Sequence, residues 1–285
     1  MSSPLVSISC ITYNHTKYIR KCLDGFLMQR TNFEFEILIH DDASTDSTAN
    51  IIKEYVALHP NIIKPIYQIE NQYSKGQRGI NIKYNFPRCQ GKYIALCEGD
   101  DYWTDPLKLQ KQVDFLEGNK EYTGCFHYTQ TIKENGESGR MYGQNSNKVD
   151  FNAEDTFSTL ALFHTSSFVF LRSALELPIW LSKVVSGDMA LFSIIASKGK
   201  LRCLPEIMSV YRKHEGGITN TPNILDNYHS QRIELMGYLN EFHNYKYQKA
   251  ADTVIEYHRM ALNTNSKKIG LFHKVIRKVK KIIYG

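Results

Sequence analysis

Blocks of apolar and polar positions alternate along the first third of the chain. Short β-branched, apolar runs predict strands, whereas apolar residues that recur at helical spacing predict helices. The strand-like runs occupy 5–13, 33–42, 62–69 and the end of 84–97, and the helix-like segments occupy 15–29, 44–60 and 105–119. Because strands and helices alternate, we expect an α/β fold with a mostly parallel central sheet and helices on both of its faces.

The pattern is less regular after residue 119. Residues 133–148 are polar and rich in glycine, which predicts a mobile loop. A strand that leads into a helix start is expected at 165–175, a buried helix at 187–199 and paired strands at 201–214. From about Ile224 onward the sequence favours helices.

Two regions are expected from this pattern, an α/β domain at 1–222 and a C-terminal helical region at 223–285. The formal charge of +6 is unevenly distributed, because residues 267–285 hold seven Lys and Arg residues and no acidic residue. The rest of the chain is therefore close to neutral. A near-neutral body argues against a nucleic-acid-binding protein, which would carry a basic face.

The cysteines and the N-terminus bear on the cellular compartment. Six cysteines are scattered without CxxC spacing, so neither a disulfide framework nor a zinc site is expected. No apolar run approaches the roughly 20 residues that span a bilayer. The first residues lack the basic region of a signal peptide. We expect a protein of the reducing cytoplasm.

Polar residues gather where three of the predicted strands end. These residues are Thr12, Tyr13 and Asn14 after the first strand, Asp41 and Asp42 after the second, and Glu98 to Asp101 after the fourth. In open α/β sheets, ligands bind outside the carboxyl ends of the strands. Neither a GxGxxG nor a GxxxxGK[ST] motif is present, so a dinucleotide site or a P-loop lacks support.

The adjacent carboxylates of Asp100 and Asp101 need a compensating charge. Like charges this close repel unless a proton or a cation lies between them. Oxygen ligands suit Mg²⁺ or Mn²⁺, which a diphosphate would complete. The alternative is that Asp101 or Thr104 caps the helix that begins near Pro106.

Five motifs occur together in a characteristic order. They are VSISCITYN at 6–14, ILIHDDASTDST at 37–48, GKYIALCEGDDYWTDPLKLQKQVDFL at 91–116, SGDMALF at 186–192 and YRKHEGGIT at 211–219. With these motifs the chain resembles the inverting nucleotide-sugar glycosyltransferases of family 2, which have the GT-A fold. The resemblance covers roughly the first 220 residues.

The resemblance implies a role for each polar residue at the strand ends. Asp101 would be the direct metal ligand, and Asp100 would lie near the ribose and also belong to the metal site. Asp42 would accept from the N3–H of uracil, and Tyr13, between Thr12 and Asn14, would stack on that base. The alternative for Asp41 and Asp42 is capping of the next helix.

The resemblance also assigns the catalytic and anion-binding residues. Asp188 would be the base that takes the proton of the acceptor hydroxyl, although Gly187–Asp188 is also a good helix start. His214 would meet the diphosphate or the metal, and Arg78 would reach a phosphate from its loop. Arg212 and Lys213 would add positive charge, whereas His164 is expected to be a buried structural histidine.

Together these features predict a metal-dependent inverting glycosyltransferase. Its cofactor would be Mn²⁺ or Mg²⁺, its donor a nucleoside diphosphate sugar, in particular a UDP-sugar, and its acceptor a glycan on a polyprenyl diphosphate carrier. The setting would be O-antigen or capsule synthesis at the inner face of a bacterial cell membrane. The alternatives are a sugar nucleotidyltransferase, which would bring a glycine-rich N-terminal phosphate loop, or a catalytically silent scaffold subunit that binds nucleotide sugars.

The basic tail at 267–285 generates the first testable prediction. As a helix it would place an apolar stripe between lysines, which suits the interface of an anionic membrane. Deleting these residues should release the protein from anionic vesicles in a sedimentation assay. Equal vesicle binding by the truncated protein would instead indicate a helix packed on the domain with solvated lysines.

Overall fold

The computed structural model describes residues 3–144, 147–217 and 222–263, with the backbone alone for 222–226. The chain divides into two compact units, Met1–Gly217 and Ile218–Gly285. The sequence-based boundary after residue 222 lies a few residues further along. Each unit is described by itself, and the basic tail at 267–285 lies outside the described residues.

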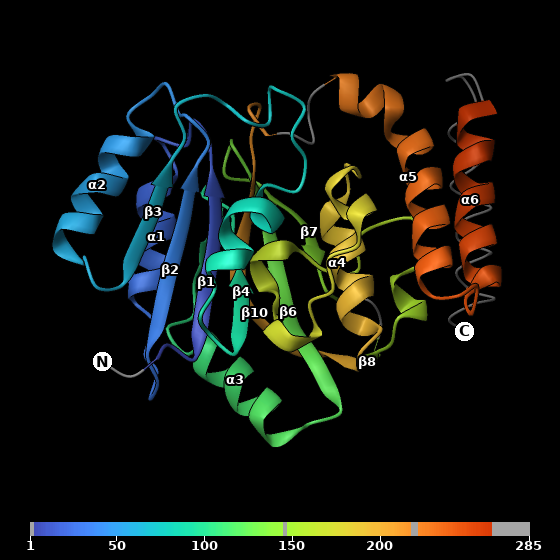
Figure 1. Ribbon diagram of the computed structural model, residues 1–285, viewed down its shortest axis with the longest axis horizontal. Helices are drawn as coiled ribbons and strands as arrows, with labels where there is room; N and C mark the ends of the chain where they lie inside the picture. Colours follow the sequence, from blue (N-terminus) through green and yellow to red (C-terminus); the bar gives the residue numbers. More distant parts are fainter. Residues whose placement is uncertain (1–2, 145–146, 218–221, 264–285) are drawn as a thin grey trace. The chain divides into compact units, whose positions relative to one another are not determined.

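One half of the central sheet in the first unit is parallel. Its strands are β1 (Val6–Thr12), β2 (Phe35–Asp41), β3 (Ile63–Tyr67) and β4 (Tyr93–Leu96). β1 pairs in parallel with both β2 and β4, and β2 pairs in parallel with β3. The arrowheads of β1, β2 and β3 therefore point to the same edge of the sheet (Figure 1). The four predicted strands are confirmed.

The other half of the sheet is mixed. Its strands are β5 (Tyr102–Trp103), β6 (Tyr122–Lys133), β7 (Ser138–Tyr142), β8 (Asp150–Phe151), β9 (Val169–Leu171) and β10 (Lys200–Lys213). The main path runs β3-β2-β1-β4-β9-β6-β10-β5, with β7 on β6 and β8 on β10. β9 is antiparallel to both neighbours, whereas β10 runs parallel to β6.

In this half one strand was not predicted and two sequence-based expectations are wrong. β6 has no predicted counterpart, because most of its residues are buried and a strand buried on both faces loses the alternation of polar and apolar positions. The expected loop at 133–148 contains β7. The expected pair of strands at 201–214 is the single strand β10, whose register against β6 shifts between Leu204 and Ile207. Pro205 lies in this bulge, where the missing N–H costs no ladder bond.

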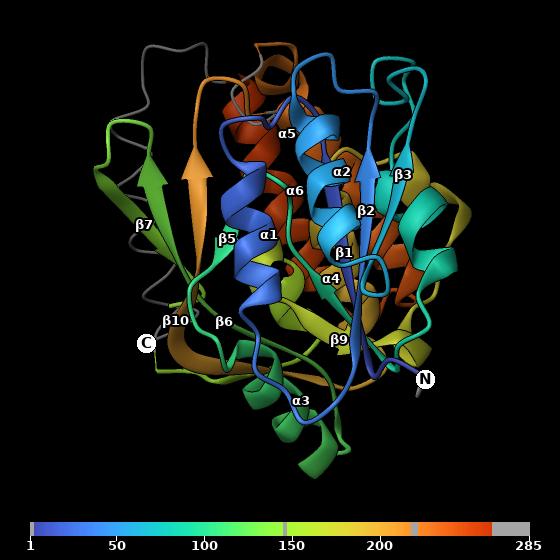
Figure 2. The same cartoon turned by 90° about the vertical axis from the view of Figure 1, so that its left-hand side faces the viewer.

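Helices cover both faces of the sheet, as predicted. On one face, α1 (Ile19–Leu27), α2 (Thr48–Leu58) and α3 (Lys108–Gly118) share a buried core with the strands. Figure 2 shows α1 and α2 side by side on this face. The other face of β1 presents Ser7 and Ser9, and it meets the π-helix at Asn81–Asn85. There the Asn85 amide donates to Ser9 Oγ at 3.1 Å.

α4 (Gly187–Ala196) begins near Asp188, as the sequence predicts, and is buried along most of its length. Its Phe192 ring packs on Phe163, with ring centroids 3.9 Å apart. Short 3₁₀ turns connect the longer elements. They lie at Phe86–Arg88, Glu154–Thr156, Thr165–Ser167, Arg172–Ala174 and Ile179–Ser182.

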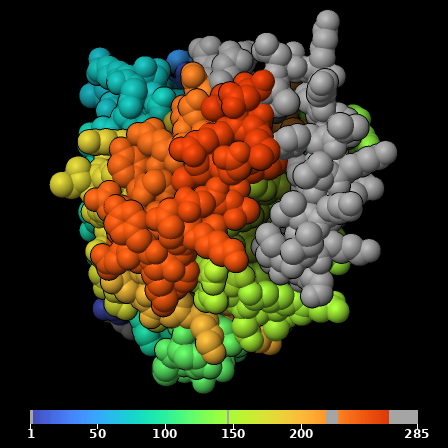
Figure 3. Space-filling view, turned by 90° about the vertical axis from the view of Figure 1, so that its right-hand side faces the viewer, coloured from blue at the N-terminus to red at the C-terminus, as the bar shows by residue number. Residues whose placement is uncertain are grey.

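Residues 222–263 of the second unit form two helices, α5 (Pro222–Phe242) and α6 (Gln248–Asn263), in agreement with the helical prediction. Figure 3 shows their surfaces side by side, α5 in orange and α6 in red. Asn240 donates to Gln248 Oε1 at 2.8 Å, close to the turn that joins them. Within the described residues, no helix combines the length and apolar character needed to cross a membrane.

Lys108, in the first turn of α3, is a fully buried basic residue in the first unit. Its Nζ donates to Gln112 Oε1 at 2.8 Å and lies 3.9 Å from the centroid of the Trp103 ring. Burial lowers the pKa of Lys108 to about 7. The folded protein therefore holds this amine largely neutral at mildly alkaline pH, where the unfolded chain keeps it protonated.

This difference predicts how stability depends on pH. Between the folded pKa and the ordinary value near 10.5, the unfolded chain binds one more proton, so the native protein loses stability as pH falls through this range. Lys108→Met removes this dependence. The melting temperature of Lys108→Met relative to the native protein should therefore rise as pH falls from about 10 to about 7. Exposed Lys53→Met is the control, and a pH-independent difference for Lys108→Met would contradict the prediction.

Candidate active site

An acidic loop, Glu98–Asp101, follows β4 at the carboxyl edge of the parallel strands. Its backbone is fixed to the end of β1, because Gly99 N–H donates to Ile11 O at 2.9 Å. A turn closes it, with Asp101 N–H donating to Glu98 O at 3.0 Å. A Cβ on Gly99 would lie 2.6 Å from Thr12 Oγ1, so only glycine lets the loop approach β1 this closely.

The Asp100 carboxylate is held between two imidazoles. Its Oδ2 lies 3.0 Å from His214 Nε2 and 3.7 Å from His15 Nε2. Burial opposes ionisation of Asp100, but the His214 hydrogen bond and the charges of both imidazoles outweigh it and lower its pKa. Its Oδ1 is buried and has no hydrogen-bond partner among the residues that the structure describes. One oxygen is therefore restrained, and the other remains available to a ligand.

Asp101 is fully buried and faces a different set of groups. Its Oδ1 accepts from Arg212 N–H at 2.9 Å. Its Oδ2 finds no hydrogen-bond partner in the described part of the chain and lies 3.7 Å from His164 Nε2. Burial and the charge of Asp100 raise the pKa of Asp101. One of the two oxygens is thus committed to joining β10 to the acidic loop.

Arg212 connects β10 to two other segments. Its Nη1 donates to Asp100 O at 2.7 Å and to Tyr18 O at 3.3 Å. Its guanidinium carbon lies 4.4 Å from the centroid of the Tyr102 ring. The guanidinium therefore donates to groups within the protein. From the sequence, Arg212 was expected to add positive charge for the diphosphate. Its neighbour Lys213 is exposed.

Glu98 and Asp188 bring the start of α4 into the same electrostatic environment. Burial raises the pKa of Glu98 to about 8, with further contributions from the charges of Asp100 and Asp188. Glu98 is therefore largely protonated at neutral pH. Asp188 lies in the first turn of α4 and is partly accessible. The acidic loop and this predicted base are thus close enough to interact.

The residues at the end of β1 differ in their contacts. The Tyr13 side chain is 42% exposed and can receive a planar ligand. Thr12 Oγ1 lies 3.0 Å from His15 Nδ1. Asn14 has a positive φ of 54°, which asparagine tolerates, and its Oδ1 accepts from Thr45 N–H at 2.8 Å. Asn14 therefore joins the loops that follow β1 and β2.

Asp42 and Arg78 meet through the loop that follows β3. The two carboxylate oxygens of Asp42 accept from Gln72 N–H at 2.8 Å and from Tyr73 N–H at 3.0 Å. The Arg78 guanidinium carbon lies 4.2 Å from the Tyr73 ring centroid, and its Nη1 donates to Tyr73 O at 3.2 Å. Asp42 thus holds this loop in place, and its predicted contact with a base would add to these hydrogen bonds.

Two groups of side chains in the described residues have the spacing to hold a metal ion. One contains Glu98, Asp100 and Asp101, and the other contains His15, Asp100 and His214. Asp100 belongs to both. The buried, unpaired Oδ1 of Asp100 and Oδ2 of Asp101 are the kind of oxygen that a divalent cation would satisfy. The residues present therefore fit a metal ion.

Two residues of this site, His15 and His164, were not assigned to it from the sequence. His15 follows the Thr12–Asn14 turn, and its position at a strand end was the signal that could have identified it. His164, expected to be structural, faces Asp101. Arg212 was found by its motif, but the inward direction of its side chain depends on the three-dimensional packing.

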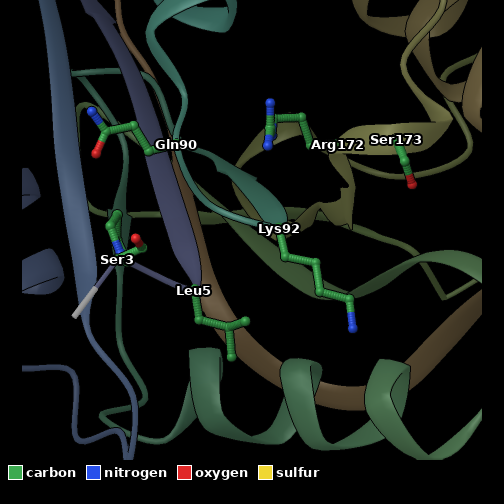
Figure 4. Close-up of a pocket in the computed structure, with 7 residues that line it drawn as sticks. Ser3, Leu5, Gln90, Lys92, Arg172 and Ser173 are labelled. Carbon is green, nitrogen blue, oxygen red and sulfur yellow. The ribbon is translucent and has the colours of Figure 1, made fainter.

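A separate cavity of about 510 Å³ lies at the opposite end of the strands. Figure 4 shows its lining around the segments that enter β1 and β4. The lining residues are Ser3, Pro4, Leu5, Gln90, Lys92, Arg172 and Ser173. None of them is a carboxylate, a cysteine or a histidine, so this cavity lacks the groups that the acidic loop provides.

The contacts of Arg212 generate a prediction. Arg212→Met removes the donor to the Asp100 and Tyr18 carbonyls but keeps the backbone N–H that Asp101 accepts from. The fold should persist, and Mn²⁺ affinity measured by calorimetry should fall about tenfold because Asp100 loses its alignment. Exposed Arg20→Met is the matched control. Native affinity in Arg212→Met would show that Asp100 keeps its position without the guanidinium.

Comparison with solved structures shows the same fold. Staphylococcus aureus TarS 1-349 in complex with UDP-GlcNAc superposes with a TM-score of 0.60 at 18% identity, covering 82% of this chain and 65% of that chain. The mannosyltransferase PcManGT from Pyrobaculum calidifontis, in complex with GDP-Man and Mn²⁺, gives 0.55 at 14% identity, covering 98% and 81%. The predicted GT-A fold is confirmed.

Comparison of sequences shows the family. An uncharacterized protein of Mycobacterium tuberculosis is 41% identical over 219 residues, covering 75% of this chain and 60% of that protein. The chain thus spans 60% of the length of this relative. The UDP-Glc:alpha-D-GlcNAc-diphosphoundecaprenol beta-1,3-glucosyltransferase WfaP of Escherichia coli is 30% identical over 218 residues, covering 75% of this chain and 80% of WfaP. Residues 7–177 match the family described as Glycosyl transferase family 2, and the chain belongs to that family.

Proposed function

We propose that the protein is a metal-dependent inverting glycosyltransferase that moves a sugar from a nucleoside diphosphate donor to a hydroxyl group of a glycan. The observation that carries this proposal is the convergence of Asp100, Glu98, His214 and Asp188 at the carboxyl edge of the parallel strands. These residues come from the end of β4, the end of β10 and the start of α4. They combine cation-binding groups with a separate carboxylate, as such a transfer requires.

The metal site in this proposal centres on Asp100. Its unpaired Oδ1 is the first ligand, and Asp101 Oδ2 or His214 supplies the next. A bound Mn²⁺ or Mg²⁺ ion would neutralise the charge that develops on the leaving nucleoside diphosphate. The chain contributes the alignment of the ligands, because Arg212 N–H holds Asp101 and the imidazoles hold Asp100.

Asp188 is the proposed general base. It accepts the proton of the acceptor hydroxyl while that oxygen attacks the anomeric carbon of the donor. Only one base is needed, because the leaving group departs as a diphosphate. The charge of Asp188 contributes to the raised pKa of Glu98, so the two side chains are close. Because Glu98 is largely protonated at neutral pH, it adds little negative charge beside Asp188.

The donor in this proposal is a UDP-sugar. The exposed ring of Tyr13 offers a stacking surface to the base, and in the loop anchored by Asp42 the Arg78 guanidinium lies over the Tyr73 ring. The complex of TarS with UDP-GlcNAc supports a UDP-linked donor by analogy with the same fold. Because PcManGT binds GDP-Man, the test also includes a GDP-linked donor.

The proposed acceptor is a glycan on a polyprenyl diphosphate carrier at the inner face of a bacterial membrane. This step is supported by WfaP, whose name gives a diphosphoundecaprenol-linked GlcNAc as its acceptor. In this proposal the region 223–285 and its basic tail bring the enzyme to the surface that carries the acceptor. O-antigen or capsule synthesis is the corresponding setting.

The test separates donor binding from transfer. The native protein, incubated with Mn²⁺ and a panel of UDP-sugars and GDP-Man, should release nucleoside diphosphate, and failure with every donor would contradict the proposal. Asp188→Asn should keep donor affinity and lose about 10²- to 10⁴-fold in transfer rate. Exposed Asp114→Asn is the matched control. Near-native transfer by Asp188→Asn would remove Asp188 from the role of base.

A further inference from the structure

His15 lies in the active site although no role has yet been given to it. It follows the turn at the end of β1, next to the acidic loop. Its Nε2 and the Nε2 of His214 both approach Asp100 Oδ2, at 3.7 Å and 3.0 Å. These side chains come from three segments that are far apart in the sequence. Two imidazoles and one carboxylate therefore converge on one point.

The surroundings of His15 restrict where its ring can lie. Its side chain is 16% exposed, and its Nδ1 lies 3.0 Å from Thr12 Oγ1. A Cβ on Gly99 would lie 3.0 Å from the same Nδ1 and 2.6 Å from Thr12 Oγ1. The space is available only because residue 99 is glycine. Thr12, His15 and Gly99 thus pack closely against one another beside Asp100.

The hydroxyl of Thr12 gives His15 the arrangement typical of a metal ligand. A ligating imidazole commonly donates its second N–H to a neighbouring oxygen, which fixes the ring and leaves the other nitrogen for the metal. In the tautomer in which Nδ1–H donates to Thr12 Oγ1, the Nε2 of His15 carries no proton and faces Asp100. The ligand atoms of all three residues lie within 4.8 Å of one another.

The ligand type discriminates between the two ions considered above. Mg²⁺ prefers carboxylates and water in a strict octahedron, whereas imidazole nitrogen favours transition metals. A site made by Glu98, Asp100 and Asp101 would offer oxygen alone. A site made by His15, Asp100 and His214 would offer two nitrogens and one oxygen, to which a diphosphate adds further oxygens.

We propose that His15, oriented by Thr12, completes a metal site with Asp100 and His214 and makes the enzyme prefer Mn²⁺ to Mg²⁺. This inference rests on the proposed function, because it concerns the metal of the same reaction. His15 acts as a ligand, and Thr12 is a positioning residue that acts through it. A bound ion would take the place of the hydrogen bond that joins His214 to Asp100.

The test measures metal binding without turnover. Calorimetric affinities for Mn²⁺ and for Mg²⁺ are determined in the presence of saturating UDP, which cannot transfer a sugar. His15→Gln should lose about tenfold or more in Mn²⁺ affinity and much less in Mg²⁺ affinity. Thr12→Val should change both affinities in the same direction as His15→Gln, whereas Thr12→Ser, which keeps the hydroxyl, should remain close to native. His59→Gln, in the turn after α2, is the matched histidine control.

A spectroscopic measurement provides an independent readout. Pulsed electron paramagnetic resonance of bound Mn²⁺ should detect nitrogen coupled directly to the ion in the native protein, and less of it in His15→Gln. An unchanged ratio of Mn²⁺ to Mg²⁺ affinity in His15→Gln, or the same nitrogen signal in both proteins, would overturn the inference and favour the carboxylate group.

The outcomes for the two proposals are distinguishable. A native protein that releases UDP from a UDP-sugar, while His15→Gln keeps native metal preference, contradicts only the role of His15. A native protein that binds neither UDP nor GDP, and releases neither from any donor of the panel, contradicts the glycosyltransferase proposal and this inference together. A shifted metal preference in His15→Gln that still releases UDP with Mg²⁺ supports both.

Discussion

The concentration of negative charge in the acidic loop is the constraint on which the site depends. Glu98, Asp100 and Asp101 lie within one tight turn, and Asp101 is completely buried. Each carboxyl is accommodated in a different way. Glu98 retains its proton at neutral pH, Asp100 is held by imidazoles, and Asp101 accepts a backbone N–H from β10. The unpaired oxygens that remain give the loop its capacity for a cation, since a buried carboxylate oxygen without a partner is otherwise costly.

The two halves of the sheet bring different residues to the acidic loop. The parallel half places the ends of β1, β2 and β4 at one edge, which gathers the polar residues that follow these strands. The mixed half returns the chain through β10, so that Arg212 and His214 reach the acidic loop from a separate direction. The bulge at Pro205 shifts the register of this long strand before it reaches the loop. The last residues of β10 thus connect the central sheet to the acidic loop.

The sequence predicted the parallel half and the acidic loop well, because apolar strands that end in polar residues leave a local pattern. It failed for β6, since a strand buried on both faces loses the alternation that identifies it. Arg212 was predicted to add positive charge for an anion, and the structure shows in addition that its Nη1 donates to the Asp100 and Tyr18 carbonyls. Its direction depends on contacts with residues more than a hundred positions away, and no local signal reports them. His15 was missed although its position at a strand end was a local signal.

The long sequence separation of these contacts has a consequence for how the protein is made. Arg212 and His214 contact Asp100 across 112 and 114 residues. Closing such a distance costs chain entropy that only the rest of the sheet can offset. The acidic loop is synthesised early, but its partners emerge from the ribosome much later. During synthesis its carboxylates must therefore remain solvated, and the cation site becomes complete only after β10 has joined the sheet.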